Sequence, residues 1–305
     1  MTKQHNDTNT SHTLRPDSRS IPVLQQRRGA RQHSVTHTQV LTVRPGAVLE
    51  QTDWLAAEEP LEIRVHGPGQ EITSVSITMR TPGHDHELAV GFLYTEGLLH
   101  ARAEIIAVTP DSGEQDEQPC NVVTVQLAHS FNAASLQRNF YATSSCGICG
   151  KASLEQLAVH CTPVAPGPVL ARSVLVELPT TLRTAQQLFE QTGGLHACGL
   201  FDVTGRLLSL REDVGRHNAV DKLIGQMVLA GKAPLAEQIL LVSGRTSFEI
   251  MQKAAMAQVP IVCAVSAPSS LAVEIAQRFH MTLIGFLRDQ SCNVYTHPER
   301  IALER

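Results

Sequence analysis

The second half of the chain repeats one pattern three times: a short apolar run, a compact polar segment and a stretch with helical periodicity. The apolar runs cover residues 207–210, 238–242 and 261–265, and a fourth run at 282–286 follows the last helical stretch. Short apolar runs are typical of buried strands, and their alternation with helices is typical of βαβ units. The pattern therefore predicts an α/β fold built on a parallel or mixed sheet.

Each predicted strand ends in a polar segment that contains an arginine or small hydroxyl residues. Arg216 and His217 follow the first strand, and Arg245 lies in the Ser-Gly-Arg-Thr-Ser segment after the second. Arg288 follows the last strand. Ligands of such sheets bind at the carboxyl ends of the strands, and a small-residue turn that opens a helix suits an anion. We therefore predict that the three arginines converge on one polyanionic ligand.

An alternative explanation of segment 211–218 needs no ligand. Asn218 can cap the following helix, with Asp221 three positions on, as in a capping box. Salt bridges and surface charge would then account for the other polar residues of the segment. Both interpretations remain open at this point. Segment 243–247 is not a Walker P-loop, because the G-x-x-x-x-G-K-[ST] spacing is absent.

The chain between residues 35 and 143 has a different organisation. Alternating apolar residues predict three strands, and a Gly-Pro-Gly turn at 67–69 joins the second to the third. A helix is predicted at 86–97, closed by Gly97, and two more strands at 122–127 and 140–143. This part is predicted to be α+β and mostly antiparallel. The alternating residues of the three strands are Val40, Thr42 and Arg44, then Leu61, Ile63 and Val65, then Val75, Ile77 and Met79.

Charge distribution separates the first 34 residues from the rest. They hold six basic and two acidic residues and show no apolar period, which predicts a disordered basic tail. Such a tail could dock on an acidic partner or on RNA, or be a solvated extension without a specific role. We therefore predict three segments: a tail at 1–34, an α+β domain at 35–143, and at 144–305 a cysteine-bearing loop followed by the α/β domain.

Composition excludes several classes of protein. The formal net charge is -4, from 25 basic and 29 acidic residues, so nothing global indicates a nucleic-acid binder. No apolar run reaches the ~18 residues of a membrane helix, and the N-terminus lacks the apolar stretch of a signal peptide. We expect a cytoplasmic protein with neither a membrane nor a nucleic acid as its partner.

Two of the seven cysteines form a C-x-x-C pair, Cys146 and Cys149, directly before a helical pattern. A helix N-terminus lowers the pKa of a nearby thiol, and Lys151 adds to that effect. Gly147 and Gly150 leave the sulfur atoms accessible. These features predict a nucleophilic, sulfur-carrying cysteine.

Other interpretations of the pair stay open. A structural zinc ion needs four ligands, and the chain has no second C-x-x-C; only His196 and Cys198 could complete such a site. A thioredoxin-like redox pair would sit in a small βαβ unit, and two inert thiols are a further possibility. Deaminase zinc chemistry fails, because His86 stands where Glu is required and Ser145 replaces the proline before the first cysteine. We expect no metal ligands.

Six segments together resemble the formate dehydrogenase accessory sulfurtransferases, the FdhD family. The most specific are the Cys-Gly-Ile-Cys-Gly loop and the R-E-D-V-G-R-H-N-A-V-D-K motif. The resemblance implies a cytidine deaminase-like, three-layer α/β domain with a smaller, mostly antiparallel N-terminal domain, and a homodimer. The basic tail lies outside the family pattern. The segments cover residues 59–65, 81–99, 145–151, 211–223, 243–253 and 285–295.

The resemblance also implies a function. Such a sulfurtransferase receives sulfur from a cysteine desulfurase as a persulfide on Cys146. It passes the sulfur to the molybdenum or tungsten of a bis-molybdopterin guanine dinucleotide cofactor, which is cargo, and which the formate dehydrogenase catalytic subunit requires. Cys149 would release the sulfur or steady the persulfide. The segment implied to bind the cofactor comprises Phe286, Leu287, Arg288, Asp289, Gln290 and Ser291.

Two functions of other classes remain. One is a cofactor-binding chaperone without persulfide chemistry. The other is a small zinc or redox C-x-x-C protein.

Overall fold

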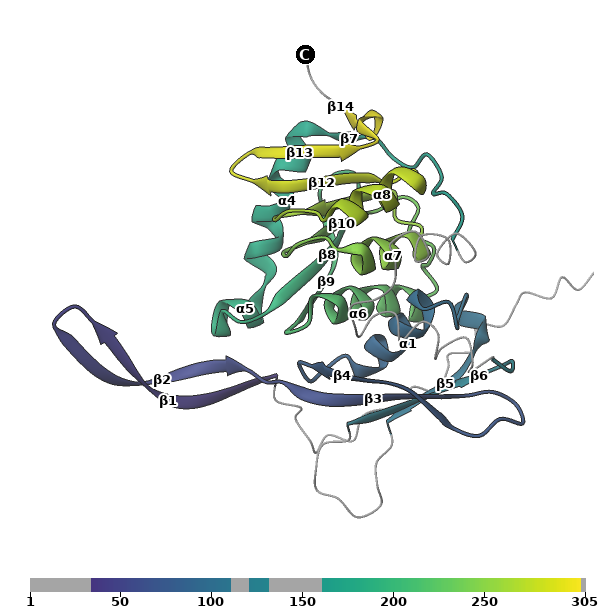
Figure 1. Ribbon diagram of the computed structural model, residues 1–305, viewed down its shortest axis with the longest axis horizontal. Coiled ribbons are helices and arrows are strands. Elements are labelled where there is room, and N and C mark those ends of the chain that lie inside the picture. Colours follow the sequence, from purple (N-terminus) through teal and green to yellow (C-terminus); the bar gives the residue numbers. More distant parts are fainter. Residues whose placement is uncertain (1–33, 111–120, 132–160, 303–305) are drawn as a thin grey trace, which may run out of the picture.

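The structure, a computed structural model, describes residues 34–110, 121–131 and 161–302. A six-stranded mixed sheet forms its second half, in the order β13-β12-β11-β10-β8-β9 (Figure 1). β10, β11 and β12 are parallel, whereas β8 runs antiparallel to both of its neighbours. The predicted mixed sheet is confirmed, with two additional strands, β8 and β13. The strands are β8 (His196–Phe201), β9 (Leu207–Asp213), β10 (Ile239–Val242), β11 (Ile261–Ala264), β12 (Thr282–Arg288) and β13 (Ser291–Thr296).

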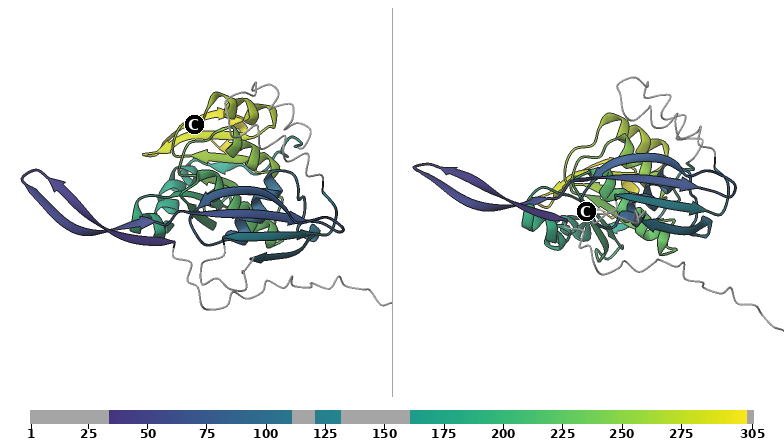
Figure 2. Two further views of the ribbon diagram at one scale, coloured as in Figure 1. Left: turned by 60° about the horizontal axis from the view of Figure 1, so that its bottom comes forward. Right: turned by 90° about the horizontal axis from the view of Figure 1, so that it is seen from below.

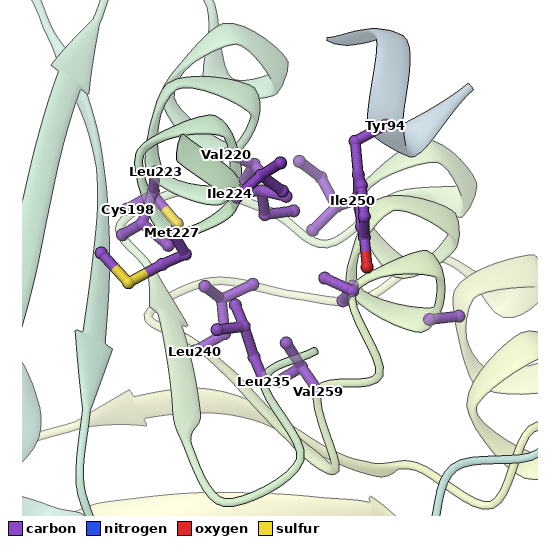
Figure 3. Close-up of a cluster of buried hydrophobic side chains, with 14 of the residues drawn as sticks. Tyr94, Cys198, Val220, Leu223, Ile224, Met227, Leu235, Leu240, Ile250 and Val259 are labelled. Carbon is purple, nitrogen blue, oxygen red and sulfur yellow. The ribbon is translucent and has the colours of Figure 1, made fainter. Parts of the chain in front are cut away.

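Helices cover both faces of this sheet, which gives the expected three layers (Figure 1). On one face α4 packs through Leu175, Leu178 and Leu182. On the other face three helices enclose a second apolar core. Figure 3 shows part of that core, where Val220, Leu223 and Ile224 lie near strand residue Leu240. The helices are α4 (Arg172–Ala185), α5 (Gln187–Thr192), α6 (Arg216–Leu229), α7 (Phe248–Met256) and α8 (Ser270–Arg278).

The N-terminal part contains a second sheet in the order β4-β3-β6-β5. The β3–β6 pair is parallel and the other two pairs are antiparallel, so the described strands confirm a mostly antiparallel sheet. Helix α1 (Asp85–Thr95) covers its apolar face and corresponds to the helix predicted at 86–97. The strands are β3 (Glu59–His66), β4 (Thr73–Arg80), β5 (Ile105–Pro110) and β6 (Val122–Leu127).

Two glycines bring α1 and α6 into direct backbone contact. A Cβ atom at Gly225 would lie 1.8 Å from the carbonyl oxygen of Glu87, and one at Gly91 would lie 1.8 Å from that of Asp221. No side chain fits between the two helices at this crossing. The contact joins the smaller sheet to the three-layer part.

A two-stranded hairpin, which we call the arm, stands away from the rest of the molecule (Figures 1 and 2). It consists of β1 (Val35–Arg44) and β2 (Ala47–Ala56), joined by the two-residue turn Pro45-Gly46. The predicted strand around Val40 is confirmed as β1. β2 was not predicted, because the polar residues 50–53 interrupt its apolar alternation.

Short elements complete the described chain: η1 (Arg102–Glu104), β7 (Leu170–Ala171), η2 (Pro298–Arg300) and β14 (Ile301–Ala302). The basic tail, the strand predicted at 140–143 and the Cys146–Cys149 pair lie outside the described residues. The three-segment division of the chain stays a prediction. Within the described residues, no helix is long and apolar enough to cross a membrane.

Candidate functional site at the carboxyl edge of the six-stranded sheet

Strands β9, β10, β11 and β12 all end at one edge of the six-stranded sheet, where β8 begins. Helices α6, α7 and α8 start at the same edge, so their positive N-terminal ends face it together. We call this region the carboxyl edge. The prediction that the polar segments gather there is confirmed.

Backbone hydrogen bonds join the turns of the carboxyl edge into a continuous rim. The Thr246 N–H donates to the Ala267 carbonyl at 3.3 Å, and the Ser269 N–H donates to the Thr246 carbonyl at 2.9 Å. The Phe286 N–H donates to the Ser266 carbonyl at 3.1 Å. The turns that follow β10 and β11 are therefore fixed relative to one another and to β12.

Much of the R-E-D-V-G-R-H-N-A-V-D-K motif supports the fold. Arg211 Nη2 donates to Glu87 Oε1 on α1 at 2.7 Å. The Glu212 carboxylate accepts the Leu188 and Phe189 N–H groups, at 3.1 and 2.8 Å, and so holds the start of α5. Both side chains are therefore engaged in the fold and do not bind a ligand in this arrangement.

The same motif contains both residues of one buried ion pair behind the carboxyl edge and one residue of a second. Asp213 and Lys222 are 2.7 Å apart and almost fully buried, and the Asp213 carboxylate also accepts the Thr81 N–H at 3.2 Å. Asp221 meets Lys253 of α7 at 2.9 Å. Burial raises the pKa of Asp221 and the Lys253 charge opposes that rise. These pairs fix α6 against β9 and α7.

The capping role predicted for Asn218 is wrong. Helix α6 starts at Arg216 after Gly215, without a side-chain cap. Asn218 lies inside the first turn, and its Nδ2 donates to the Met79 carbonyl at 2.8 Å. The amide therefore joins α6 to β4 through a backbone carbonyl of the neighbouring sheet.

Arg216 and His217 are the motif residues that remain for a ligand. Among the described residues, the buried Nε of Arg216 has no hydrogen-bond partner. His217 Nε2 lies 3.3 Å from Ser247 Oγ and 3.9 Å from Glu249 Oε2, at the start of α7. The edge between α6 and α7 thus presents an arginine with an unused donor beside a histidine and a serine.

Both histidines of this cluster have pKa values below the usual value for histidine. Burial, followed by the positive charges of Arg216 and Lys253, lowers the pKa of His217 to about 4. Burial and the Arg216 charge also lower the pKa of His196, the first residue of β8. The His196 ring lies against Gly244, where a Cβ atom would be 3.2 Å from Nδ1. Arg216 is consequently the main source of formal positive charge in the cluster.

The three predicted arginines are spaced along the carboxyl edge. Two strand spacings separate β9 from β10, and two more separate β10 from β12. At about 4.8 Å per spacing, the ends of β9 and β12 lie roughly 19 Å apart. One ligand that contacts Arg216, Arg245 and Arg288 must therefore be an extended one.

The segment implied to bind the cofactor forms the β12–β13 hairpin. Arg288 is exposed, and its guanidinium carbon lies 5.9 Å from the centre of the Phe286 ring. Asp289 and Gln290 have positive φ angles, 50° and 58°, as a tight two-residue turn requires. Leu287 is fully buried in the core on the α4 side, so its side chain supports packing. The exposed residues of the segment are Arg288, Asp289, Gln290 and Ser291.

Three described cysteines are buried and poorly suited to nucleophilic chemistry. Burial raises the pKa of Cys161 to about 12, and also raises that of Cys198 and Cys263. Cys198 lies in the apolar core shown in Figure 3. The zinc site that would combine it with His196 is therefore not supported. Across the described ranges, no cluster of three or more His, Cys, Asp or Glu side chains is arranged to hold a metal ion.

Sequence reasoning assigned no role at this edge to Ser247 or Glu249, and it considered His196 only as a zinc ligand. Ser247 and Glu249 contact His217, and His196 lies against Gly244, only because the fold brings α6, α7 and β8 to the same edge. The only sequence signal for a role of His196 at this edge was its position as a polar residue at the start of the apolar run of β8.

A model of the FdhD/NarQ family matches residues 56–302. The sulfur carrier protein FdhD of Streptomyces avermitilis is 49% identical over 275 residues, which span 87% of this chain and 94% of that protein. The protein of the same name from Thermoplasma volcanium is 44% identical over 259 residues, 84% of this chain and 91% of its own length.

A solved structure is similar as well. The crystal structure of a protein from Desulfotalea psychrophila, described as a formate dehydrogenase accessory protein, superposes with a TM-score of 0.68 and 26% identity. The superposition covers 88% of this chain and 99% of the other. Both the sequence relatives and the fold agree with the resemblance carried by the motifs. The chain belongs to the FdhD/NarQ family.

Proposed function

We propose that the chain is a sulfurtransferase that accepts sulfur from a cysteine desulfurase on Cys146. It then delivers the sulfur to a bis-molybdopterin guanine dinucleotide cofactor destined for a formate dehydrogenase. The observation that carries this proposal is the similarity, over more than four fifths of the chain, to proteins named sulfur carrier protein FdhD. The C-x-x-C pair supplies the chemistry, and the Desulfotalea protein's description as a formate dehydrogenase accessory protein supports the recipient.

Loading is a thiolate exchange. The Cys146 thiolate attacks the outer sulfur of the desulfurase persulfide, the S–S bond breaks, and the desulfurase leaves as a thiolate. The product is a persulfide on Cys146, and no external oxidant or reductant is consumed. Buried thiols with raised pKa values, such as Cys161, Cys198 and Cys263, do not compete in this step, because the thiolate is the nucleophile.

Delivery uses the second cysteine of the pair. The Cys149 thiolate attacks the inner sulfur of the persulfide, closes a Cys146–Cys149 disulfide and expels hydrosulfide. The hydrosulfide becomes the sulfur ligand of the cofactor metal, and a cellular dithiol then reduces the disulfide for the next cycle. A variant that lacks Cys149 but still transfers sulfur would assign Cys149 to steadying the persulfide.

The carboxyl edge is the surface we assign to the cofactor. Its length of roughly 19 Å suits an extended dinucleotide better than a single phosphate. Helix N-termini and arginines favour phosphate groups. The unused Nε of Arg216 is a donor that a buried phosphate oxygen would satisfy. Arg288, stacked near Phe286, is placed to contact the nucleotide at the other end.

Intact-mass spectrometry tests the carrier step. The protein is incubated with a cysteine desulfurase and cysteine, and one sulfur should add roughly 32 Da. Cys146→Ala should abolish the adduct, whereas Cys292→Ala, which alters a partly exposed cysteine of β13, should keep it.

The other outcomes identify the alternatives. An intact cofactor-binding protein without any adduct would be a chaperone without persulfide chemistry. Stoichiometric zinc in the purified protein would instead support a zinc C-x-x-C protein. An adduct that survives Cys146→Ala would move the carrier to another cysteine.

Nucleotide binding tests the assignment of the edge. Guanosine diphosphate should bind the full-length protein in calorimetry, and Arg288→Ala should weaken its affinity. The matched control is Arg278→Ala, because Arg278 is also exposed but lies in the last turn of α8, at the end of that helix away from the carboxyl edge. Equal affinity in the two variants would remove the β12–β13 hairpin from the site.

A further inference from the structure

Two buried polar atoms without partners lie where α6 and α7 begin, on the same face of the six-stranded sheet (Figure 1). They are Nε of Arg216, the first residue of α6, and Oγ1 of Thr246, in the turn that leads into α7. Among the described residues one other buried side-chain atom, Gln238 Oε1, also lacks a hydrogen-bond partner. Proteins pair almost all of their buried polar groups. The two atoms therefore mark a place where a ligand supplies the missing partners.

The groups next to these atoms favour an anion. Ser247 follows Thr246 directly, and its Oγ lies 3.3 Å from Nε2 of His217. No side chain caps the N-terminus of α6 or of α7 among the described residues, so their first-turn N–H groups add positive partial charge. We call Arg216, His217, Ser247 and Glu249 the α6–α7 cluster. It presents donors from two helices to one region of the carboxyl edge.

The formal charges of the α6–α7 cluster nearly cancel. Arg216 carries one positive charge, and the Glu249 carboxylate lies 3.9 Å from His217 Nε2. Lys253 also faces His217, but Asp221 pairs with it at 2.9 Å. Burial, followed by the charges of Arg216 and Lys253, lowers the pKa of His217 to about 4, so this ring is uncharged at neutral pH. An anion that carries two charges therefore needs a further positive charge in order to bind here.

We propose that the α6–α7 cluster binds a diphosphate that joins two organic groups, and that His217 takes up a proton when the diphosphate binds. Arg216 and the protonated ring then match the two negative charges, and Ser247 adds a hydrogen bond. The two helix N-termini, at roughly half a charge each, offset Glu249. The proton comes from solvent and remains on the ring while the ligand is bound. This assignment rests on the proposed function, because a diphosphate of this kind is part of the guanine dinucleotide cofactor.

Two contacts favour His217 as the group that gains the proton. Its side chain is 34% exposed, and the nearby Glu249 carboxylate stabilises the protonated ring. Ser247 Oγ can accept a hydrogen bond from that ring. The other histidine that faces this position, His196 of β8, packs against Gly244 instead. His196 therefore provides a control from the same edge.

Calorimetry with diguanosine diphosphate, in which a 5′–5′ diphosphate joins two guanosines, tests the site in the full-length protein. The charge of this compound is constant near neutral pH, unlike that of a terminal phosphate with a pKa of about 6. Titrations in two buffers of different ionisation enthalpy count the protons taken up. At about pH 5.5 the wild type should gain about half a proton or more per ligand. Its affinity should then be about twofold or more higher than at about pH 7.5.

Three variants locate the proton and the ligand. His217→Gln should bind without proton uptake and with an affinity that does not depend on pH. His196→Gln, the matched control, removes a histidine that also faces Arg216 and should keep the proton uptake. Arg216→Gln should weaken binding at both pH values. Circular dichroism checks that each variant is folded.

NMR reads the same proton without relying on a variant's affinity. In the wild type, saturation with diguanosine diphosphate should raise the pKa of His217 from about 4 to about 5.5 or higher. The resonance is assigned by its absence in His217→Gln. An unchanged pKa in the saturated protein would overturn the proposed proton uptake.

The outcomes separate this site from the rest of the proposed function. Binding without proton uptake, uptake that His217→Gln retains, or full affinity in Arg216→Gln would each overturn the site and leave the sulfur-carrier step standing. Absence of binding at both pH values would overturn the site together with the assignment of the carboxyl edge to the cofactor. Absence of the persulfide on Cys146, with proton-linked binding intact, would instead refute the carrier step alone.

Discussion

Replacing Gly225 by alanine tests how the two halves of the molecule are joined. At an exposed helix position, glycine to alanine stabilises by about 1 kcal/mol, because alanine is the better helix former. At Gly225 the added Cβ would lie 1.8 Å from the Glu87 carbonyl oxygen and 2.6 Å from the Gly91 nitrogen. Both atoms belong to the backbone of α1, so no side chain can rotate away.

The structure sets the size of the effect. Ordinary contact needs about 3.4 Å, so α1 and α6 must separate by about 1.6 Å. Overpacking of this kind costs about 3 kcal/mol, and the gain in helix propensity offsets about 1 kcal/mol of it. We therefore expect Gly225→Ala to lower the free energy of unfolding by about 2 kcal/mol.

Urea unfolding followed by circular dichroism measures this change. The control is Gly194→Ala, because a Cβ at Gly194 meets no atom closer than 3.9 Å and its φ is not positive. That control should be neutral or gain about 0.4–1 kcal/mol from a less flexible unfolded chain. A Gly225→Ala protein as stable as the Gly194→Ala protein would refute the close helix crossing.

Three further predictions concern the buried charges. Lys253→Met leaves the Asp221 carboxylate buried without its cation and should cost about 3–5 kcal/mol at pH 7 in urea unfolding. The loss should shrink in acid, where Asp221 is protonated; a loss independent of pH would contradict the pair. In NMR titrations the His217 pKa should lie near 4 and rise in Arg216→Gln, because a neighbouring positive charge is lost; an unchanged pKa would rule out that coupling. Unfolded His217 binds protons near pH 6.5, so wild-type stability should fall as the pH drops from 6.5 to 4, and His217→Gln should flatten that slope.

The elements that sequence reasoning predicted correctly are those whose signals are local. The apolar runs followed by polar turns and helices specify β9 to β12, and they also place the turns at one edge, because parallel strands end together. β2 was missed since its polar residues 50–53 interrupt the alternation that marks a strand, and nearly all of its side chains are exposed in the part of the chain that the structure describes. Helix α4 was also not predicted, because Pro179 lies inside it and weakens the local helical signal.

The site was harder to predict than the fold for a physical reason. A polar residue in a turn can face a ligand, cap a helix or meet a buried partner from a distant segment, and the sequence does not distinguish these. Asn218 and Asp221 meet Met79 and Lys253, which only the packing of α6 against β4 and α7 brings close. Arg216 remains for a ligand because no such partner reaches its Nε among the described residues.

Transfer of labelled sulfur tests the central proposal most directly. The protein is loaded from a desulfurase with ³⁵S-cysteine, freed of small molecules, and mixed with a formate dehydrogenase that holds its cofactor without the sulfur ligand. We predict that label leaves the carrier and appears in the dehydrogenase cofactor, with formate oxidation rising in parallel, and that Cys146→Ala transfers none. Label that stays on the carrier while formate oxidation still rises, or equal transfer by Cys146→Ala, would contradict sulfur transfer through Cys146.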